Sequence, residues 1–369
     1  MRQRETVAPY SKAPERVLHN TPNPFPLSLH LSAVPTPARQ TPEERGLARD
    51  EVRLLVLHRA TGRIEHTQFL KMTDFLRAGD VLVVNDSKTL PASMPAIRVK
   101  TGSHLRIHLA LCLTPTVYVV ERRTMDGLAD EQPFDIGEQL FIGGVATTVL
   151  GHFHPNSRLW YVESRGDLWQ AAATCGQPIR YEYLQSRPDL DAYQTVFAKH
   201  SGSAEMPSAA RPFSNRVLSE LRQNGVAITN ITLHTGVSSH EVVGSLDDHP
   251  FLPEWFSVPQ ATADVVNRAN RDGRRVIAAG TTVVRALAAA TGRDGLVMGN
   301  KSGWTTVVIT PNNPPVSVTS LLTGLHHDAT SHLAMLYAFV TPEQLHKAYE
   351  EALHREYLWH EFGDSNLIL

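Results

Sequence analysis

Apolar residues in the first part of this chain occur in short runs that are typical of buried strands. Two such runs, at 52–57 and 81–84, are bounded by turn residues, and each predicts a strand. The first run is followed by a turn at Gly62 and by a segment at 63–69. We expect this segment to pair with the first strand as a hairpin.

Beyond residue 191 a helical spacing takes over and alternates with longer apolar strands. Glycine directly follows two of the helical patterns, which is a common stop signal because glycine adopts the left-handed conformation that ends a helix. The expected elements are helices over 215–224, 260–272, 282–290 and 333–340, and strands over 226–233 and 275–279. Strands and helices in alternation predict a mostly parallel sheet covered on both faces, which is a three-layer α/β domain.

Between residues 93 and 164 the pattern changes to short segments of alternating apolar and polar residues separated by turns. This pattern is typical of a small antiparallel barrel. Because α/β patterns flank it, we interpret 93–164 as an inserted β-barrel domain within a discontinuous α/β domain formed by 25–92 and 165–369. Residues 1–24 hold several prolines among charged and polar neighbours, and we expect them to be a disordered tail.

The composition limits the compartment and the kinds of partner. The chain has 369 residues, with 35 Lys and Arg against 37 Asp and Glu, so its formal charge is -2. This balance gives no overall sign of nucleic-acid binding, although it leaves room for a local basic face. The two cysteines, Cys112 and Cys175, are too few for a zinc cluster or a disulfide framework. Without a long apolar run or a signal peptide, the chain is expected to be cytoplasmic and to make no membrane contact.

The most informative local sequence is the apolar strand that runs into Gly280-Thr281-Thr282 at the start of a predicted helix. Free backbone N–H groups and two hydroxyl groups at a helix N-terminus can bind a carboxylate or a ribose oxygen. One turn further, Arg285 could contact an anionic group. The alternative is that a threonine only caps the helix and that Arg285 is a surface charge.

Two histidine-containing segments are further candidates. His234 follows an apolar strand, where open α/β sheets place ligand groups, and could act as an acid, a base or a hydrogen-bond donor. A purely structural histidine is the alternative there. The segment from His326 to His332 carries three histidines and an aspartate, but His326, His327 and Asp328 are consecutive rather than on one helix face. We therefore do not expect a metal site.

A loop rich in small and hydroxyl residues runs from Tyr193 to Ser214, where a ligand could approach the backbone closely. By itself this signal is weak. The chain contains no GxGxxG, Walker A, HExxH, GxSxG or CxxC pattern, which disfavours the commonest dinucleotide, nucleoside-triphosphate, metalloprotease, hydrolase and thioredoxin-like functions.

Taken together and in this order, these segments resemble the S-adenosylmethionine:tRNA ribosyltransferase-isomerases of queuosine biosynthesis. The resemblance runs from about Phe25 to the C-terminus. The matching motifs are Gly79-Asp80 with Asn85-Asp86-Ser87 and Pro91-Ala92, then 193–198, Gly202-Ser203 with Pro207, Thr232-Leu233-His234 with Gly236, Gly280-Thr281-Thr282 with Arg285, His326 with Ala338-Phe339, and Phe362-Gly363-Asp364.

The resemblance implies an enzyme that uses S-adenosylmethionine as a ribosyl donor and tRNA as its partner, without a metal. The ribose would pass to the aminomethyl group of a 7-deazaguanine base and rearrange, releasing adenine and methionine. Such a reaction needs a base to remove a proton next to the sulfonium, and groups that bind or protonate the departing adenine. The implied catalytic residues are His234 and His326. The implied substrate-binding residues are Asp86, Gln194, Thr195, Ser203, Ser208, Phe213, Gly236, Gly280, Thr281, Thr282, Arg285 and Ser331.

Several motif residues depart from the family pattern. Pro212 and Leu252 stand where the family usually has histidines, Ser93 replaces an arginine, and Ala288 replaces a glutamate. Proline and leucine cannot donate, accept or transfer a proton. Unless His240, His327 or His332 substitutes for the lost histidines, these changes favour a different acceptor. The alternatives are therefore a relative that transfers to a small-molecule acceptor and a non-catalytic S-adenosylmethionine-binding protein.

Overall fold

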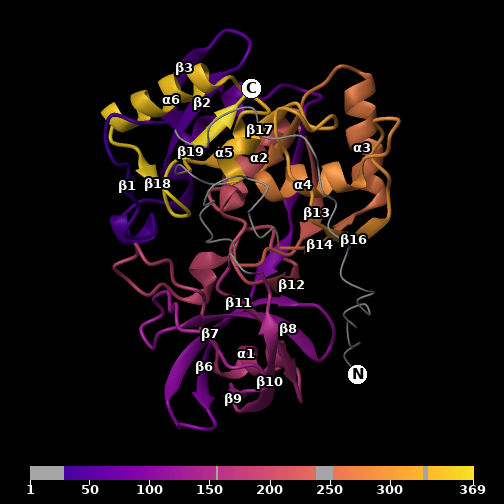
Figure 1. Cartoon of the computed structure of the whole chain (residues 1–369). Coiled ribbons are helices and arrows are strands. Elements are labelled where there is room, and N and C mark those ends of the chain that lie inside the picture. The colour runs from indigo at the N-terminus through magenta and orange to yellow at the C-terminus, as the bar shows by residue number, and fades with distance from the viewer. Residues whose placement is uncertain (1–28, 155–156, 238–251, 327–330) are drawn as a thin grey trace.

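The computed structural model describes residues 29–154, 157–237, 252–326 and 331–369. Figure 1 shows two parts, a larger one in which helices cover a sheet and a smaller barrel at its lower end. The tail expected over 1–24 lies outside the described residues. No helix among the described residues is long and apolar enough to span a membrane.

Within the described residues, nine strands form the sheet of the larger part. Their order across the sheet is β16 (Lys301–Thr305), β14 (Glu254–Val258), β13 (Ala227–Leu233), β4 (Val81–Asn85), β15 (Val276–Ala279), β17 (Ser320–Gly324), β19 (Ser365–Ile368), β2 (Arg53–His58) and β3 (Arg63–Gln68). The run from β13 to β17 is parallel, as is the pair β19–β2, whereas the remaining pairs are antiparallel. The expectation of a mostly parallel sheet was therefore wrong, because four of the eight neighbouring strand pairs are antiparallel.

Side chains alternate along each strand and supply two separate hydrophobic layers. On β2, for example, Leu55 and Leu57 belong to one buried cluster, and Leu54 and Val56 belong to the other. The first cluster includes residues of α3 (Gln260–Arg271), α4 (Thr281–Ala290), α5 (Ser331–Leu336) and α6 (Pro342–His354). The second cluster includes residues of α2 (Asn215–Gln223) and the short helix η3 (Phe69–Phe75). The sheet thus has helices on both faces, in the three layers that were predicted.

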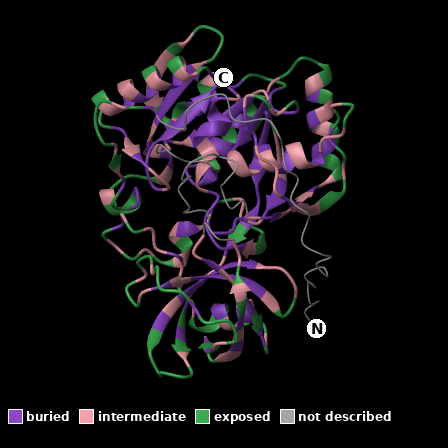
Figure 2. Cartoon of the chain, in the orientation of Figure 1, coloured by how far each residue is buried: buried purple, intermediate pink, exposed green. Residues whose placement is uncertain are grey.

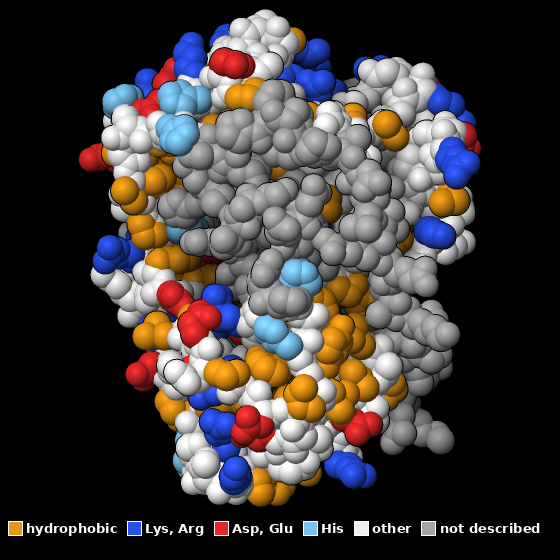
Figure 3. Space-filling view, viewed as in Figure 1, with side chains coloured by type: hydrophobic (Ala, Val, Ile, Leu, Met, Phe, Trp, Pro, Cys, Tyr) orange, Lys and Arg blue, Asp and Glu red, His pale blue; other side chains and the backbone are white. Residues whose placement is uncertain are grey.

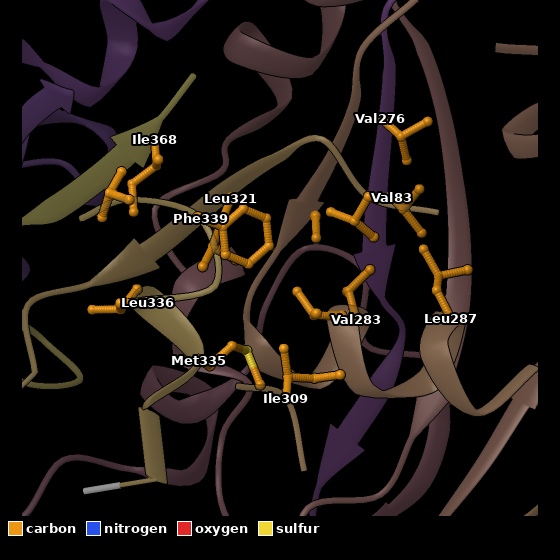
Figure 4. Packing of buried hydrophobic residues seen from close by; sticks show 14 of the residues in the cluster. Val83, Val276, Val283, Leu287, Ile309, Leu321, Met335, Leu336, Phe339 and Ile368 are labelled. Atoms are coloured by element: carbon orange, nitrogen blue, oxygen red, sulfur yellow. The ribbon is translucent and has the colours of Figure 1, made fainter. Parts of the chain in front are cut away.

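Packing between α4 and the sheet centre is close. Figure 4 shows Val283 and Leu287 of α4 near Val83 and Val276 of the strands, and all four are fully or almost fully buried. In Figure 2 the buried residues fill the middle of the sheet and the inside of the barrel, and exposed residues lie mainly at the periphery. This packing fixes the start of α4 relative to the ends of the central strands.

The smaller part is a closed antiparallel barrel that runs from Ser93 to Ser164. Around the barrel the order is β10 (Val145–His152), β11 (Leu159–Ser164), β8 (Val117–Arg123), β7 (His104–Cys112), β6 (Ser93–Arg98) and β9 (Gln139–Ile142). The helix α1 (Leu168–Cys175) follows, begins at an Asp167 cap and buries Leu168 in the barrel core. The predicted fold class, a three-layer α/β part with an inserted antiparallel barrel, is confirmed.

Two short parallel pairs connect more distant segments. The ribbon of β5 (Ser87–Thr89) and β12 (His200–Ser203) lies between the sheet and the barrel, and β1 (Thr36–Pro37) pairs with β18 (Leu358–Trp359). The short helices are η1 (Glu43–Arg45), η2 (Arg49–Glu51), η4 (Leu190–Tyr193) and η5 (Ser208–Ala210).

Candidate functional site

Polar side chains gather where the parallel strands β13, β4, β15 and β17 end. Ligands of open α/β sheets bind at this carboxyl edge. Most of the candidate residues from the sequence belong to segments that leave these strands, or to the ribbon of β5 and β12 beside them. The shared strand edge is the geometric reason why segments far apart in sequence meet here.

Asn85, at the end of β4, joins three elements through one buried amide. Its Oδ1 accepts hydrogen bonds from the backbone N–H of Leu233 at 3.0 Å and of Ser87 at 3.1 Å. Its Nδ2 donates to the carbonyl oxygen of Leu233 at 2.9 Å and lies 3.3 Å from the hydroxyl oxygen of Thr282. Asn85 therefore fixes the end of β13 and the first turn of α4 relative to each other.

Asp86 is a buried carboxylate that is held by its neighbours. Its Oδ1 accepts a hydrogen bond from the Thr232 hydroxyl at 2.6 Å, and its Oδ2 accepts one from the Asn230 amide at 2.6 Å. The Nε2 atom of the partly exposed His200 lies 3.7 Å from the same Oδ2. Asp86 thus accepts two short hydrogen bonds from side chains of β13 and lies next to a partly exposed histidine.

His234 follows β13 directly and is enclosed on both faces of its ring. One face stacks on Trp255, with ring centroids 5.3 Å apart and planes at 18°. The backbone of Gly202 covers the ring, since a Cβ atom there would lie 2.6 Å from three of its atoms. The Nδ1 atom lies 2.8 Å from the Ser87 hydroxyl. Burial, with a smaller contribution from the charge on His200, lowers the pKa of His234 to about 4, so its ring is neutral at neutral pH.

The Ser203 hydroxyl lies beneath His234 rather than at a surface. Its oxygen is 2.6 Å from the Ser87 hydroxyl and accepts a hydrogen bond from the backbone N–H of Thr235 at 3.0 Å. Ser87 and Ser203 are both fully buried. Ser203 was expected to bind the substrate, but the structure places it in the layer that supports His234.

Gly280 begins α4 with φ of 104°, a left-handed conformation that favours glycine. A Cβ atom there would lie 3.3 Å from the Cβ of Ala209, in the loop that carries η5. Thr281 and Thr282 occupy the first turn of α4 and are both half-buried. The helix start is thus built as the sequence predicted, with two hydroxyl residues at the carboxyl edge of the sheet.

Arg285 is already paired within the protein. Its guanidinium forms an ion pair with Glu254, at the start of β14, and donates to the carbonyl oxygen of Val307 at 3.1 Å. Glu254 in turn accepts a hydrogen bond from the backbone N–H of Gly236 at 3.3 Å. Gly236 also packs against the barrel strand β7, since a Cβ atom there would lie 3.3 Å from a methyl group of Leu111.

His326 lies beyond the end of β17, three strands away from β13 in the sheet. Three strand spacings correspond to about 14 Å, so His234 and His326 do not contact each other. The Nε2 atom of His326 is 2.7 Å from the Thr323 hydroxyl, and its ring packs against His332 at 4.5 Å between centroids. Ser331 is the first residue of α5 and is half-buried.

The structure does not bring all the expected residues to this edge. Phe213 is fully buried in the core, with edge-on contacts to Phe69 and Phe197, and we leave it out of the site. The Gln194 amide makes two hydrogen bonds, of 3.2 and 2.9 Å, to the backbone of Thr89 and so anchors its loop.

Two further expected residues lie in the loops beside the site. The hydroxyl of the buried Thr195 accepts a hydrogen bond from the N–H of Phe197 at 3.3 Å. Ser208 begins η5, which lies close to β17, and is half-buried.

Sequence reasoning missed the residues that support the site. Ser87 and Gly202 were noted only as motif residues, and no role was predicted for them or for Glu254 and Trp255, although each contacts one of the candidates. A polar run directly after a buried strand was the available signal for Ser87. His240 and His327, which were named as substitutes for lost histidines, lie outside the described residues.

Within the part of the chain that the structure describes, no three or more His, Cys, Asp or Glu side chains are grouped to hold a metal ion.

Comparison with known proteins places most of the chain in one sequence family. Residues 32–368 match a family model described as queuosine biosynthesis protein. A protein of Moorella thermoacetica named S-adenosylmethionine:tRNA ribosyltransferase-isomerase is 34% identical over 328 residues, covering 87% of this chain and 94% of its own length. A protein of the same name from Staphylococcus haemolyticus is 31% identical over 324 residues, with the same two coverages.

A solved structure is also similar. The crystal structure of S-adenosylmethionine tRNA ribosyltransferase from Thermotoga maritima matches with a TM-score of 0.51 and 25% sequence identity, covering 93% of this chain and 100% of the other. The likeness therefore includes both the α/β part and the barrel.

Proposed function

Because the chain belongs to the family of queuosine biosynthesis proteins, we propose that it is an S-adenosylmethionine:tRNA ribosyltransferase-isomerase. The observation that carries this proposal is the family match over residues 32–368, together with relatives of that name at 34% and 31% identity. The conserved fold supports it, since the barrel and the sheet both have counterparts in the Thermotoga maritima enzyme. A cytoplasmic location, where tRNA is found, fits this function.

We propose that S-adenosylmethionine lies along the carboxyl edge of the sheet, between His234 and His326. The separation of about 14 Å between these strands suits an extended ligand with a nucleoside at one end and an amino acid at the other. Thr281 and Thr282, at the N-terminus of α4 between these strands, are placed to bind a carboxylate or ribose oxygens. No metal is needed for this chemistry.

Arg285 has a different role in this proposal from the direct ligand contact that the sequence suggested. Its charge is balanced by Glu254, and Glu254 holds the backbone of Gly236. We therefore propose that Arg285 and Glu254 position the segment that follows His234.

A second candidate acceptor is a small amine or a free deazapurine instead of tRNA. The observation that favours it is Leu252, which stands where the family usually has a histidine and packs against the site at 3.4 Å from the Cβ position of Gly236. On the face shown in Figure 3, acidic and basic side chains are interspersed over the visible described residues of the barrel.

The test measures the release of adenine from S-adenosylmethionine, and chromatography detects the adenine. The purified protein is incubated with tRNA that carries 7-aminomethyl-7-deazaguanine, with the same tRNA carrying guanine, or with the free base. We expect adenine only with the first tRNA. Its loss in His234→Ala, with normal release in the exposed matched control His346→Ala, would tie the activity to this site. Release only with the free base would establish the second candidate, and no release under any condition would contradict both.

A further inference from the structure

Two serine hydroxyls beneath His234 form a chain of hydrogen bonds whose direction can be determined. Ser203 and Ser87 are fully buried, and their oxygens are 2.6 Å apart. Ser87 is in turn 2.8 Å from the Nδ1 atom of His234. Because neither hydroxyl reaches water, each hydrogen must point at one of these neighbours.

The direction is set at the far end of the chain, where the backbone N–H of Thr235 donates to Ser203 at 3.0 Å. Within the described residues, the Ser87 oxygen is then the acceptor available to the Ser203 hydrogen. Since Ser87 receives that hydrogen, it must direct its own hydrogen to Nδ1 of His234. The Nδ1 atom is therefore an acceptor, and a neutral ring with an unprotonated Nδ1 carries its proton on Nε2.

We propose that Ser203 and Ser87 fix His234 as a hydrogen-bond donor through Nε2, and that His234 therefore binds the departing adenine rather than removing the proton next to the sulfonium. This inference rests on the proposed function for the identity of the ligand. The assignment of the ring proton to Nε2 rests only on the hydrogen bonds around His234.

The ring environment supports the same assignment. Trp255 on one face and Gly202 on the other leave the ring little freedom to turn over. Protonation of Nδ1 would place a second donor against the Ser87 hydrogen, so the chain also opposes the doubly protonated ring.

The chemical consequence concerns the bond between ribose and adenine. When this bond breaks, its electron pair stays on the adenine ring, and negative charge grows on the ring nitrogens. A neutral imidazole donor stabilises that charge through its hydrogen bond, and the adenine anion takes the proton that it needs from solvent as it leaves. Removal of the proton next to the sulfonium then belongs to another group. Ser87 and Ser203 are positioning residues, because they act through His234 and are themselves buried.

The tautomer can be read directly from the full-length protein labelled with ¹⁵N-histidine. Long-range ¹H–¹⁵N spectra distinguish protonated from unprotonated ring nitrogens, and the signals that vanish in His234→Gln identify this residue. We expect an unprotonated Nδ1 and a protonated Nε2 at pH 7.5. In Ser87→Ala, which removes the hydroxyl that donates to Nδ1, the Nδ1 signal should move toward the protonated position, whereas Ser87→Thr, which keeps a hydroxyl, should leave Nδ1 unprotonated. The exposed Ser219→Ala serves as the matched control.

The functional part is tested by two amides at position 234. A glutamine places its NH₂ group near the position of Nε2 and keeps a donor there, whereas an asparagine reaches only the position of Nδ1. We expect His234→Gln to lower adenine release by about 10- to 100-fold and His234→Asn by about 1,000-fold, in the range of a lost charge-stabilising donor.

Two results would overturn the inference: a protonated Nδ1 in the unmodified protein, or equal losses in the glutamine and asparagine variants. Failure of the proposed function looks different, because the unmodified protein would then show the Nε2–H tautomer without releasing adenine.

Discussion

At the scale of single residues, the position of His234 depends on the absence of a side chain at Gly202. A Cβ atom at Gly202 would overlap the imidazole ring at 2.6 Å, and Trp255 blocks retreat on the other face. Because both faces are blocked, the overlap would displace the ring from its present position, in which Nδ1 lies 2.8 Å from the Ser87 hydroxyl. The geometry of the histidine is thus set jointly by a glycine, an indole and a hydroxyl.

We therefore expect Gly202→Ala to reduce kcat for adenine release by about 100-fold, because a displacement of about 1 Å at a reacting group has that effect. Gly303→Ala is the matched control, since Gly303 has φ of 156°, close to the 159° of Gly202, but nothing within 4 Å of its Cβ position. Gly303→Ala introduces the same backbone strain without an overlap, so it shows how much of the activity loss comes from strain alone. Equal activity losses in the two variants, measured at saturating substrate, would show that the overlap is not the cause.

Residue types and strand ends made part of this site predictable. His234 and the Gly280-Thr281-Thr282 run were found because they follow apolar strands directly. The contact between Ser87 and Ser203 could not be predicted, because it depends on the register of β5 and β12, two segments more than a hundred residues apart. The burial of Phe213 could not be predicted either, because a motif does not show which way a side chain points.

At the scale of elements, Glu254 connects β14, α4 and the segment after β13. It pairs with Arg285 of α4 and accepts the N–H of Gly236 while being only 7% exposed. A carboxylate this buried is costly without its cation. The pair therefore couples the edge of the sheet to the helix whose N-terminus faces the site.

Arg285→Met should lower the free energy of unfolding by about 1–3 kcal/mol, because it leaves Glu254 charged and unpaired. Adding Glu254→Gln should recover most of that loss, since the glutamine oxygen can still accept the N–H of Gly236. Urea unfolding of both variants measures this effect. If Arg285 acts only through Glu254, the double variant should also release adenine nearly normally. A stable but inactive double variant would instead indicate direct ligand contact by Arg285.

Elements were more predictable than their pairing. The helices α2 and α3 end just before Gly225 and Gly273, both with positive φ, as the stop signals indicated. The helix expected over 333–340 is regular only to Leu336, and the chain then continues in tighter turns, in which the N–H groups of Ala338 and Phe339 donate to the carbonyl oxygens of Met335 and Leu336 at 3.0 and 2.9 Å. Among the antiparallel pairs of the sheet, the hairpin of β2 and β3 was predicted from its turn and is confirmed, whereas the pairs β14–β16 and β17–β19 were not predicted, since they join segments far apart in the sequence.

At the scale of the whole molecule, the barrel and the sheet share one hydrophobic cluster. Val237 and Ala204 lie outside the barrel strands and are almost fully buried in the barrel core, and Leu252 and Trp304 pack against it from the same side. Val237 follows His234 by three residues. The segment that continues from β13 through His234 therefore also packs into the core of the barrel. Unfolding of the barrel would therefore expose apolar surface beside the site and release the chain around His234.

We expect this sharing to make the protein unfold in a single transition, with equal calorimetric and van't Hoff enthalpies in differential scanning calorimetry. Val149→Ala, in the barrel, and Val83→Ala, in the sheet, remove the same two methyl groups from fully buried sites. Each should move the whole endotherm down by about 2–5 °C without splitting it. A separate low-temperature peak in Val149→Ala alone, with the main peak unchanged, would mean that the barrel unfolds by itself and that the contact through Val237 does not couple the two parts.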